Sequence, residues 1–364
     1  MSIKNRVARM FSSKDQNESI RCLFILKKRE DYNTDIANFD NFTVVTGMYN
    51  SSSFVSDMLN LQYIQSKVVV VTDNNDIDRE VQDFKPSHVF IEGLWVVPEK
   101  FNVLKTLHPT VNWVVRIHSE LPFLAQEGIA MDWIHSYITK GIQVSGNSPR
   151  INRELQVMLN SLTNSDCTSL VPLLTNYYPV NLSTQHNKLP DSDEINVGCF
   201  GAVRPLKNHL SQALAAIEFA ETLGKTLRFH INVGRLEMNG ANTLKNVQAL
   251  FNASKRHELV QHDWCSHDDF LLLAKEMDIC MQVSFTETFN IVSADAVSSG
   301  VPVLTSKEIP WIRTQVADPT STVDIVSKLL YVWNNKEYVV SQNIQGLATY
   351  SNNSIQTWIN YFRG

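Results

Sequence analysis

Short runs of apolar, often β-branched residues alternate with longer amphipathic segments along most of the chain. In the first half these runs predict strands at Ile20–Leu26, Thr43–Thr46, Lys67–Thr72, His88–Ile91, Trp113–Ile117 and Ile142–Ser145. Val68–Val71 is continuously apolar, which is typical of a central parallel strand covered on both faces. Turn- and cap-forming residues follow most of these runs. The pattern predicts an open parallel βα sheet, in which ligands bind at the carboxyl ends of the strands.

The alternation stops in a polar segment, Asn181–Asp193, and then resumes. The second series predicts strands at Ile195–Phe200, Leu227–Val233, Leu259–His262, Ile279–Val283 and Val301–Leu304. Helices are expected at Leu206–Leu223, His267–Glu276, Phe289–Ser299, Ser321–Trp333 and Ser341–Phe362. We therefore expect an α/β protein of two Rossmann-like lobes, residues 1–180 and 195–340, with residues 341–364 forming a helix that packs back on the first lobe.

Composition narrows the class of protein. The 364 residues suffice for two domains, and 43% hydrophobic with 19% charged residues is normal for a globular chain. No stretch of 18 apolar residues predicts a membrane span, and the basic N-terminus lacks the apolar core of a secretory signal. Five scattered cysteines without a CxxC pair favour free thiols in a reducing compartment, so a cytoplasmic location is expected. A net charge of −5 argues against nonspecific coating of nucleic acid but allows a local basic groove.

One segment combines two carboxylates with the predicted start of a helix. Glu287 follows a strand, the amides of Thr288, Phe289 and Asn290 come next, and Asp295 lies two turns inside the helix. The unpaired amides and the dipole of a helix N-terminus bind phosphate. Carboxylates repel phosphate and suit neutral hydroxyls, so Glu287 would bind sugar hydroxyls and Asp295 a ribose diol. The alternative is that both are solvated surface acids.

A second segment, Gly201–His209, places cations after the first strand of the second series. The planar fork of Arg204 suits phosphate oxygens, and Lys207 adds a point charge. A cation at a helix start opposes the helix dipole, which argues against an ordinary basic helix terminus. Both side chains therefore suit the binding of a phosphate group.

These segments resemble retaining glycosyltransferases of the two-lobed GT-B fold, family 4 type. Residues 284–303 resemble their Glu-x7-Glu region and the Gly-hydrophobic-Pro-Val strand after it, with Asp295 in place of the second Glu. The resemblance implies lobes that face across an interdomain cleft and a nucleotide-sugar donor, most simply a UDP-sugar. It also implies that Gly201, Arg204 and Lys207 bind the donor pyrophosphate, and no metal is expected.

In the first lobe the resemblance is carried by single residues. His118 ends a predicted strand, where the resembling enzymes carry a His that contacts the transferred sugar. Gly47 begins a segment similar to the loop in which a glycine lets the backbone approach the donor phosphate. A structural His and an ordinary βα loop remain the alternatives.

The acceptor is expected from a resemblance of Val111–Trp133 to phage-encoded glycosyltransferases, some of which modify hydroxylated cytosine in DNA with glucose or arabinose. Cations that could track double-stranded DNA are Lys27, Lys28, Arg29, Arg116, Arg150 and Arg153, and aromatics that could accommodate an extruded base are Trp95, Trp133 and Tyr137. Scattered solvated charges are the alternative. The competing functions are a surface-polysaccharide or lipopolysaccharide transferase and a nucleotide-sugar-binding module without catalysis.

Two tempting patterns are interpreted as non-functional. Asp76 and Asp78 imitate the Asp-x-Asp metal motif but are expected in a solvated turn. His257, His262 and His267 recur every five residues across a change from strand to helix, which does not suit zinc.

Overall fold

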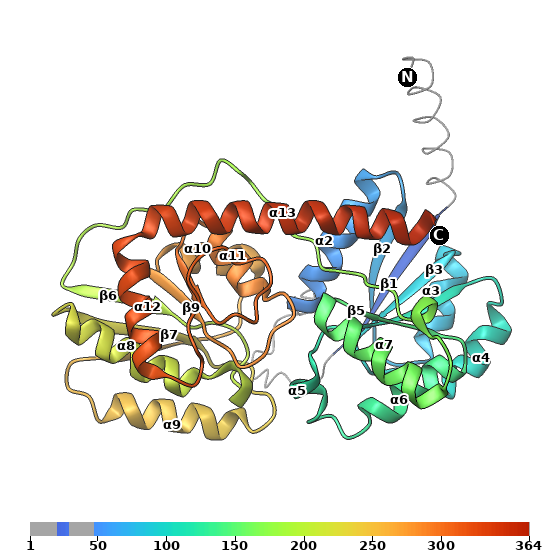
Figure 1. Ribbon diagram of the computed structural model, residues 1–364, viewed down its shortest axis with the longest axis horizontal. Helices are drawn as coiled ribbons and strands as arrows, with labels where there is room; N and C mark the ends of the chain where they lie inside the picture. Colours follow the sequence, from blue (N-terminus) through green and yellow to red (C-terminus); the bar gives the residue numbers. More distant parts are fainter. Residues whose placement is uncertain (1–19, 29–46, 364) are drawn as a thin grey trace, which may run out of the picture. The chain divides into compact units, whose positions relative to one another are not determined.

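The computed structural model describes residues 20–28 and 47–363, which divide into two compact units. The first unit contains the described residues up to Tyr178 together with Ser351–Arg363, and the second is Pro179–Tyr350. Each unit is built on one five-stranded parallel sheet flanked by helices (Figure 1). This confirms the predicted α/β class.

The first sheet has the strand order β2-β1-β3-β4-β5. Its strands are β1 (Arg21–Lys27), β2 (Gln65–Val71), β3 (His88–Glu92), β4 (Asn112–Ile117) and β5 (Gln143–Gly146). Its helices are α2 (Gly47–Leu61), α3 (Asp76–Phe84), α4 (Lys100–Leu107), α5 (Leu121–Leu124), α6 (Ala130–Thr139) and α7 (Pro149–Thr163). The strand predicted at Thr43–Thr46 lies outside the described residues.

Side chains of β1 alternate between two cores, as a strand covered on both faces requires. Leu23 and Ile25 pack with residues of α3, α4, α6 and α7. Cys22 and Phe24 point the other way and pack with α2 and with Trp358, near the end of the last helix.

The second sheet has the order β10-β9-β6-β7-β8, the strand order of the Rossmann fold. Its strands are β6 (Glu194–Gly198), β7 (Thr226–Asn232), β8 (Glu258–His262), β9 (Ile279–Gln282) and β10 (Val303–Thr305). Its helices are α8 (His209–Thr222), α9 (Gly240–Asn252), α10 (His267–Lys275), α11 (Ile291–Ser298), α12 (Thr322–Asn334) and α13 (Lys336–Arg363), whose end belongs to the first unit.

The order of the second sheet reverses between β6 and β9. In open parallel sheets the loops that leave two such strands in opposite directions form a crevice, which is where ligands bind. The loops after β6 and β9 carry the two segments singled out above, so the topology brings them to one edge.

In the described ranges, no helix combines the length and apolar character needed to cross a membrane.

Candidate active site

The loop after β6 is shaped by two residues with positive φ. Gly201 has φ of +106°, which side chains other than glycine rarely adopt, and its amide donates to Oδ1 of Asn232 over 3.0 Å. Asn208 has φ of +59° and interrupts the helix predicted from Leu206, so that a short 3-10 turn, Pro205–Lys207, precedes α8. Asn tolerates this conformation, and its side chain donates to the carbonyl oxygen of Val283 over 3.2 Å.

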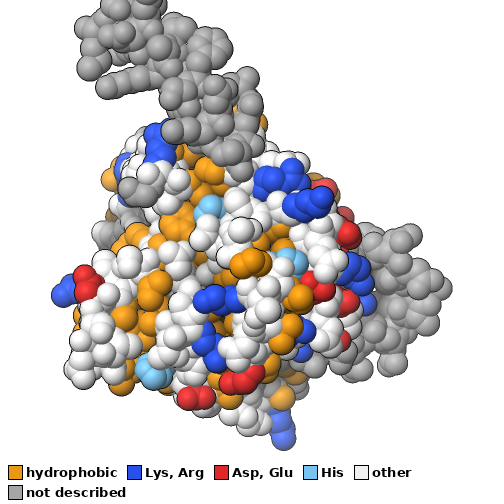
Figure 2. Space-filling view, turned by 90° about the vertical axis from the view of Figure 1, so that its right-hand side faces the viewer, with side chains coloured by type: hydrophobic (Ala, Val, Ile, Leu, Met, Phe, Trp, Pro, Cys, Tyr) orange, Lys and Arg blue, Asp and Glu red, His pale blue; other side chains and the backbone are white. Residues whose placement is uncertain are grey.

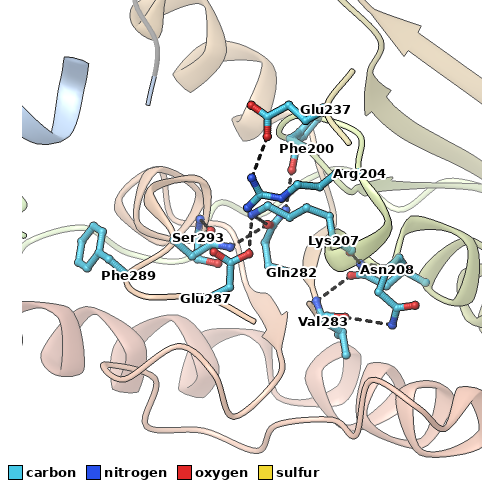
Figure 3. A network of polar contacts seen from close by, with 12 residues as sticks. Phe200, Arg204, Lys207, Asn208, Glu237, Gln282, Val283, Glu287, Phe289 and Ser293 are labelled. Atoms are coloured by element: carbon cyan, nitrogen blue, oxygen red, sulfur yellow. Dashed lines mark hydrogen bonds and ion pairs between the residues drawn. The ribbon is translucent and has the colours of Figure 1, made fainter. Parts of the chain in front are cut away.

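This interruption directs Lys207 toward the loop after β9 (Figure 3). Its Nζ donates to Oε1 of Glu287 over 2.5 Å and lies 3.4 Å from Oε1 of Gln282. The predicted cation and the predicted sugar-binding carboxylate are therefore in contact at the crevice between β6 and β9.

Glu287 is ionised in this environment. Burial alone would raise the pKa of its carboxyl, but the charges of Lys207 and Arg204 and a hydrogen bond from Lys207 hold that pKa below the usual value. Only 8% of its side chain is exposed. A buried carboxylate kept charged can accept hydrogen bonds from hydroxyl groups of a ligand.

Arg204 lies beside this pair and is held by another carboxylate. Its Nη1 donates to Oε2 of Glu237 over 2.8 Å, and Oε1 of Glu237 accepts from Arg235. Glu237 and Arg235 were not predicted from the sequence, because they lie in the loop after β7 and belong to no motif that marks them. Three cations and two carboxylates thus gather at this edge of the second sheet.

The first turn of α11 borders the same cluster. Asn290 has φ of +61° and caps the helix, because its Oδ1 accepts from the amide of Ser293 over 2.8 Å. Thr288 and Phe289 are buried beside it, and the carbonyl of Phe289 accepts from Nε1 of Trp311 over 2.8 Å. Since the Phe289 ring also packs against Trp311, a ligand contact from this residue would come from its backbone.

Asp295 is buried on α11 and has a partner that the sequence analysis did not assign. Nε2 of His267, the first residue of α10, lies 2.8 Å from Oδ1 of Asp295. This hydrogen bond, which outweighs the opposing effect of partial burial, raises the pKa of His267 above 6.5. The recurrence of His every five residues gave no hint of it. The one local signal in the sequence is that His267 directly follows Ser266, the residue that caps α10, which places His267 at the start of that helix.

Gly47 and His118 lie in the first unit. Gly47 begins α2, so the segment predicted as a loop from residue 47 to 53 is instead the start of a helix. His118 follows β4, and its Nε2 contacts the carboxylate of Glu92 while its Nδ1 lies 3.3 Å from Nδ2 of Asn147. A sugar contact from His118 would have to replace one of these bonds or use the backbone.

Glu92 is fully buried at the end of β3 and holds a second cation. Nη1 of Arg116 donates to both of its oxygens over 2.7 and 3.0 Å. Burial alone would raise the pKa of Glu92, but the charges of Arg116 and His118 and their hydrogen bonds lower it.

Two observations that favoured DNA are therefore corrected. Arg116 has no exposed surface and its charge is compensated by Glu92, so it cannot track a phosphate backbone. Tyr137 is fully buried, with its hydroxyl bonded to the carbonyl of Val96, so it cannot stack on an extruded base. On the side of the first unit seen in Figure 2, Lys and Arg side chains are spread among uncharged and acidic ones.

The Asp-x-Asp segment is also placed differently from its prediction. Asp76 and Asp78 lie in the first turn of α3, and Asp78 pairs with Nε2 of His108 over 2.7 Å. Within the described ranges, no group of three or more His, Cys, Asp or Glu side chains could hold a metal ion.

Comparisons of the whole chain with known proteins give a fold and no family. No protein-family model and no curated protein sequence matches the chain. Among solved structures, the N-terminal domain of Candida albicans trehalose-6-phosphate phosphatase matches with a TM-score of 0.67 and 9% identity, covering 94% of this chain and 96% of that one.

Two further solved structures match over most of both chains. A UDP-forming α,α-trehalose-phosphate synthase from Burkholderia xenovorans matches with a TM-score of 0.63 and 8% identity over 94% of this chain and 98% of that one. HepE of Anabaena, crystallised with UDP and glucose, matches with a TM-score of 0.58 and 12% identity over 93% and 99%. At such identities the likeness concerns the fold, and the chain has the GT-B fold with two Rossmann-like lobes.

Proposed function

We propose that the protein is a retaining glycosyltransferase that binds a UDP-sugar donor in its second unit. The observation that carries the proposal is the meeting of Arg204, Lys207 and Glu287 at the crevice between β6 and β9, beside the start of α11. The fold is shared with HepE, which was crystallised with UDP and glucose.

In this proposal the second unit acts on the leaving group. The bond from the anomeric carbon to the diphosphate breaks, and negative charge develops on the phosphate oxygens. Arg204 and Lys207 stabilise that charge together with the N-terminus of α11. Glu287 accepts hydrogen bonds from sugar hydroxyls, and Asp295 accepts them from the ribose.

Retention is proposed to follow from attack on the same face that the diphosphate leaves. The acceptor hydroxyl forms the new bond to the anomeric carbon and gives its proton to a phosphate oxygen. Double displacement would need a carboxylate as nucleophile on the opposite face. Glu287 is held by Lys207 and Glu237 by two arginines, so neither is a suitable nucleophile.

The first unit is proposed to supply the acceptor side. His118 and Gly47 stay proposed contacts of the transferred sugar and the donor phosphate. Hydroxylated or hydroxymethylated cytosine in DNA is the acceptor predicted from the sequence. It now rests on the exposed cations Lys27, Lys28, Arg150 and Arg153, of which Arg150 pairs with Glu120, and on Trp95 and Trp133. Arg29 lies outside the described residues. We also propose the cytoplasm as the location, since the five cysteines are free thiols.

Calorimetric titration with UDP and UDP-glucose tests the donor site, and Lys207→Ala and Glu287→Ala should each abolish transfer. Acceptors are then screened by mass spectrometry after incubation with UDP-sugars and DNA that carries hydroxymethyl- or hydroxycytosine. A hexose- or pentose-sized mass gain on cytosine supports DNA, whereas slow UDP release without it leaves a transferase with another acceptor, such as a surface polysaccharide. Binding without release would indicate a nucleotide-sugar-binding module, and absence of binding would contradict the proposal.

A further inference from the structure

Gln282 is the last residue of β9 and is buried, with 2% of its surface exposed. Its side chain has a partner at each end. Nε2 donates to the carbonyl oxygen of Phe200 over 2.8 Å, and Oε1 accepts from Nδ2 of Asn290 over 2.9 Å. Nζ of Lys207 lies 3.4 Å from the same Oε1 (Figure 3).

These partners fix the orientation of the amide. If the Gln282 amide were rotated, its NH₂ group would face the ammonium of Lys207 and its oxygen would face the carbonyl of Phe200. Donor would then meet donor, and acceptor would meet acceptor, inside a buried site. The oxygen of Gln282 therefore points toward Lys207 and Asn290.

The same amide connects the segments that enclose the crevice. Phe200 belongs to the loop after β6, Lys207 to the 3-10 turn before α8, and Asn290 caps α11. Gln282 thus links the ammonium of Lys207 to the N-terminus of α11, at the place where the strand order reverses. Both groups are proposed to receive the diphosphate of the donor.

The chemistry of the amide suits this position. Glu287 is a charged acceptor for Lys207, so its negative charge partly cancels the charge that the ammonium offers to a phosphate. Gln282 offers a neutral acceptor that holds the ammonium without cancelling its charge. A carboxylate at position 282 would hold Lys207 more strongly but would compete with the phosphate.

We propose that Gln282 is a positioning residue that holds Lys207 and the cap of α11 in the geometry that receives the diphosphate of the donor. This inference rests on the function proposed above and names the residue that organises its phosphate site.

A double-mutant cycle on UDP binding tests the inference. Gln282→Met keeps the approximate volume and removes both hydrogen-bonding ends. It should weaken UDP binding by at least about fivefold in the unaltered protein and by less than about twofold when Lys207 is already Met, because the two residues act together. Asn152→Met is the matched control and should leave UDP binding unchanged. Asn152 is a buried amide in the first turn of α7 in the first unit, and its Oδ1 accepts from the amide of Gly146 at the end of β5.

A second variant gives a readout that a purely structural role would not move. Gln282→Glu should bind UDP more weakly than the unaltered protein at pH 7, because the new carboxylate competes with the phosphate for Lys207. This loss should shrink to less than about twofold when Lys207 is already Met. Equal weakening in both backgrounds, by Gln282→Met or by Gln282→Glu, would overturn the inference alone. If the unaltered protein binds no UDP, the proposed function fails and the inference fails with it.

Discussion

Nζ of Lys207 donates a 2.5 Å hydrogen bond to Oε1 of Glu287, and these side chains are only 11% and 8% exposed. The cation proposed for the diphosphate and the carboxylate proposed for the sugar therefore compensate each other before a donor binds. The free site thus holds both charged groups in place without an uncompensated buried charge. A donor that binds both side chains replaces their ion pair by two bonds to the ligand.

Breaking this pair should affect activity and stability differently. Lys207→Met should lower kcat/KM by roughly 10²–10³-fold, a loss typical of removing a group that stabilises charge in the transition state. It also removes the ammonium that compensates most of the buried charge of Glu287, which should cost up to about 3–5 kcal/mol of unfolding free energy. Adding Glu287→Gln should restore part of that stability, measured by urea unfolding, while activity stays lost. A double variant that is less stable than Lys207→Met alone would contradict the pairing.

The sequence predicted these two residues because each has a local signal. Lys207 follows a strand and precedes a helix, where a cation needs an anion, and Glu287 stands at a strand end before a helix start. Apolar runs likewise predicted most strands, since parallel strands covered on both faces must be apolar. The position of Gly47 was misread because a helix N-terminus and a loop share the same small and polar residues.

The residues that were missed depend on contacts between distant segments. Gln282 ends an otherwise apolar strand, and only the fold shows that its amide meets Lys207 and Asn290. Arg116 was predicted as an exposed cation because nothing in its neighbourhood in the sequence indicates that Glu92 lies beside it. Polar residues become buried through such partners, and pattern reasoning does not predict the pairings.

Acid should destabilise the second unit through two buried histidines. Burial, with the nearby charges of Lys207 and Arg204, lowers the pKa of His209 to about 3, and burial with His262 and Arg228 does the same for His230. The unfolded chain takes up these protons near pH 6.5. Their contribution to stability is therefore complete above pH 6.5 and is lost as the pH falls toward 3, by roughly 1.4 kcal/mol per pH unit for each histidine.

Urea unfolding between pH 7 and pH 4 measures this slope. His230→Asn removes one of the two titrating groups. It should therefore reduce the slope of unfolding free energy against pH by the contribution of one histidine. The same slope in the variant and the unaltered protein would show that His230 binds its proton equally in the folded and unfolded chain.

The pair of His267 and Asp295 should govern recognition of the ribose. If Asp295 accepts a hydrogen bond from the 2′-hydroxyl, UDP should bind roughly 10–100-fold more tightly than 2′-deoxy-UDP, the range expected for a hydrogen bond to a charged group. His267→Ala should reduce this preference because the carboxylate loses the bond that orients it. Since that bond raises the pKa of His267, the preference should also be strongest at low pH and weaken as the pH rises through the raised pKa. Equal affinity of the unaltered protein for both nucleotides, by calorimetry, would remove Asp295 from the ribose site.

The buried pair of Glu92 and Arg116 should be essential for the stability of the first unit and irrelevant to UDP binding. Glu92→Gln leaves the guanidinium of Arg116 with no exposed surface and no counter-charge, which should cost about 3–5 kcal/mol of unfolding free energy. Arg116→Met alone should cost less, because His118 still contacts the buried carboxylate of Glu92. Combining the two substitutions removes both charges, so the double variant should be more stable than either single one. Melting temperatures measured with and without UDP test whether the pair affects the donor site. UDP should raise the melting temperature of the second unit in each variant as it does in the unaltered protein. Loss of UDP binding in Glu92→Gln would show that this pair acts on the donor site.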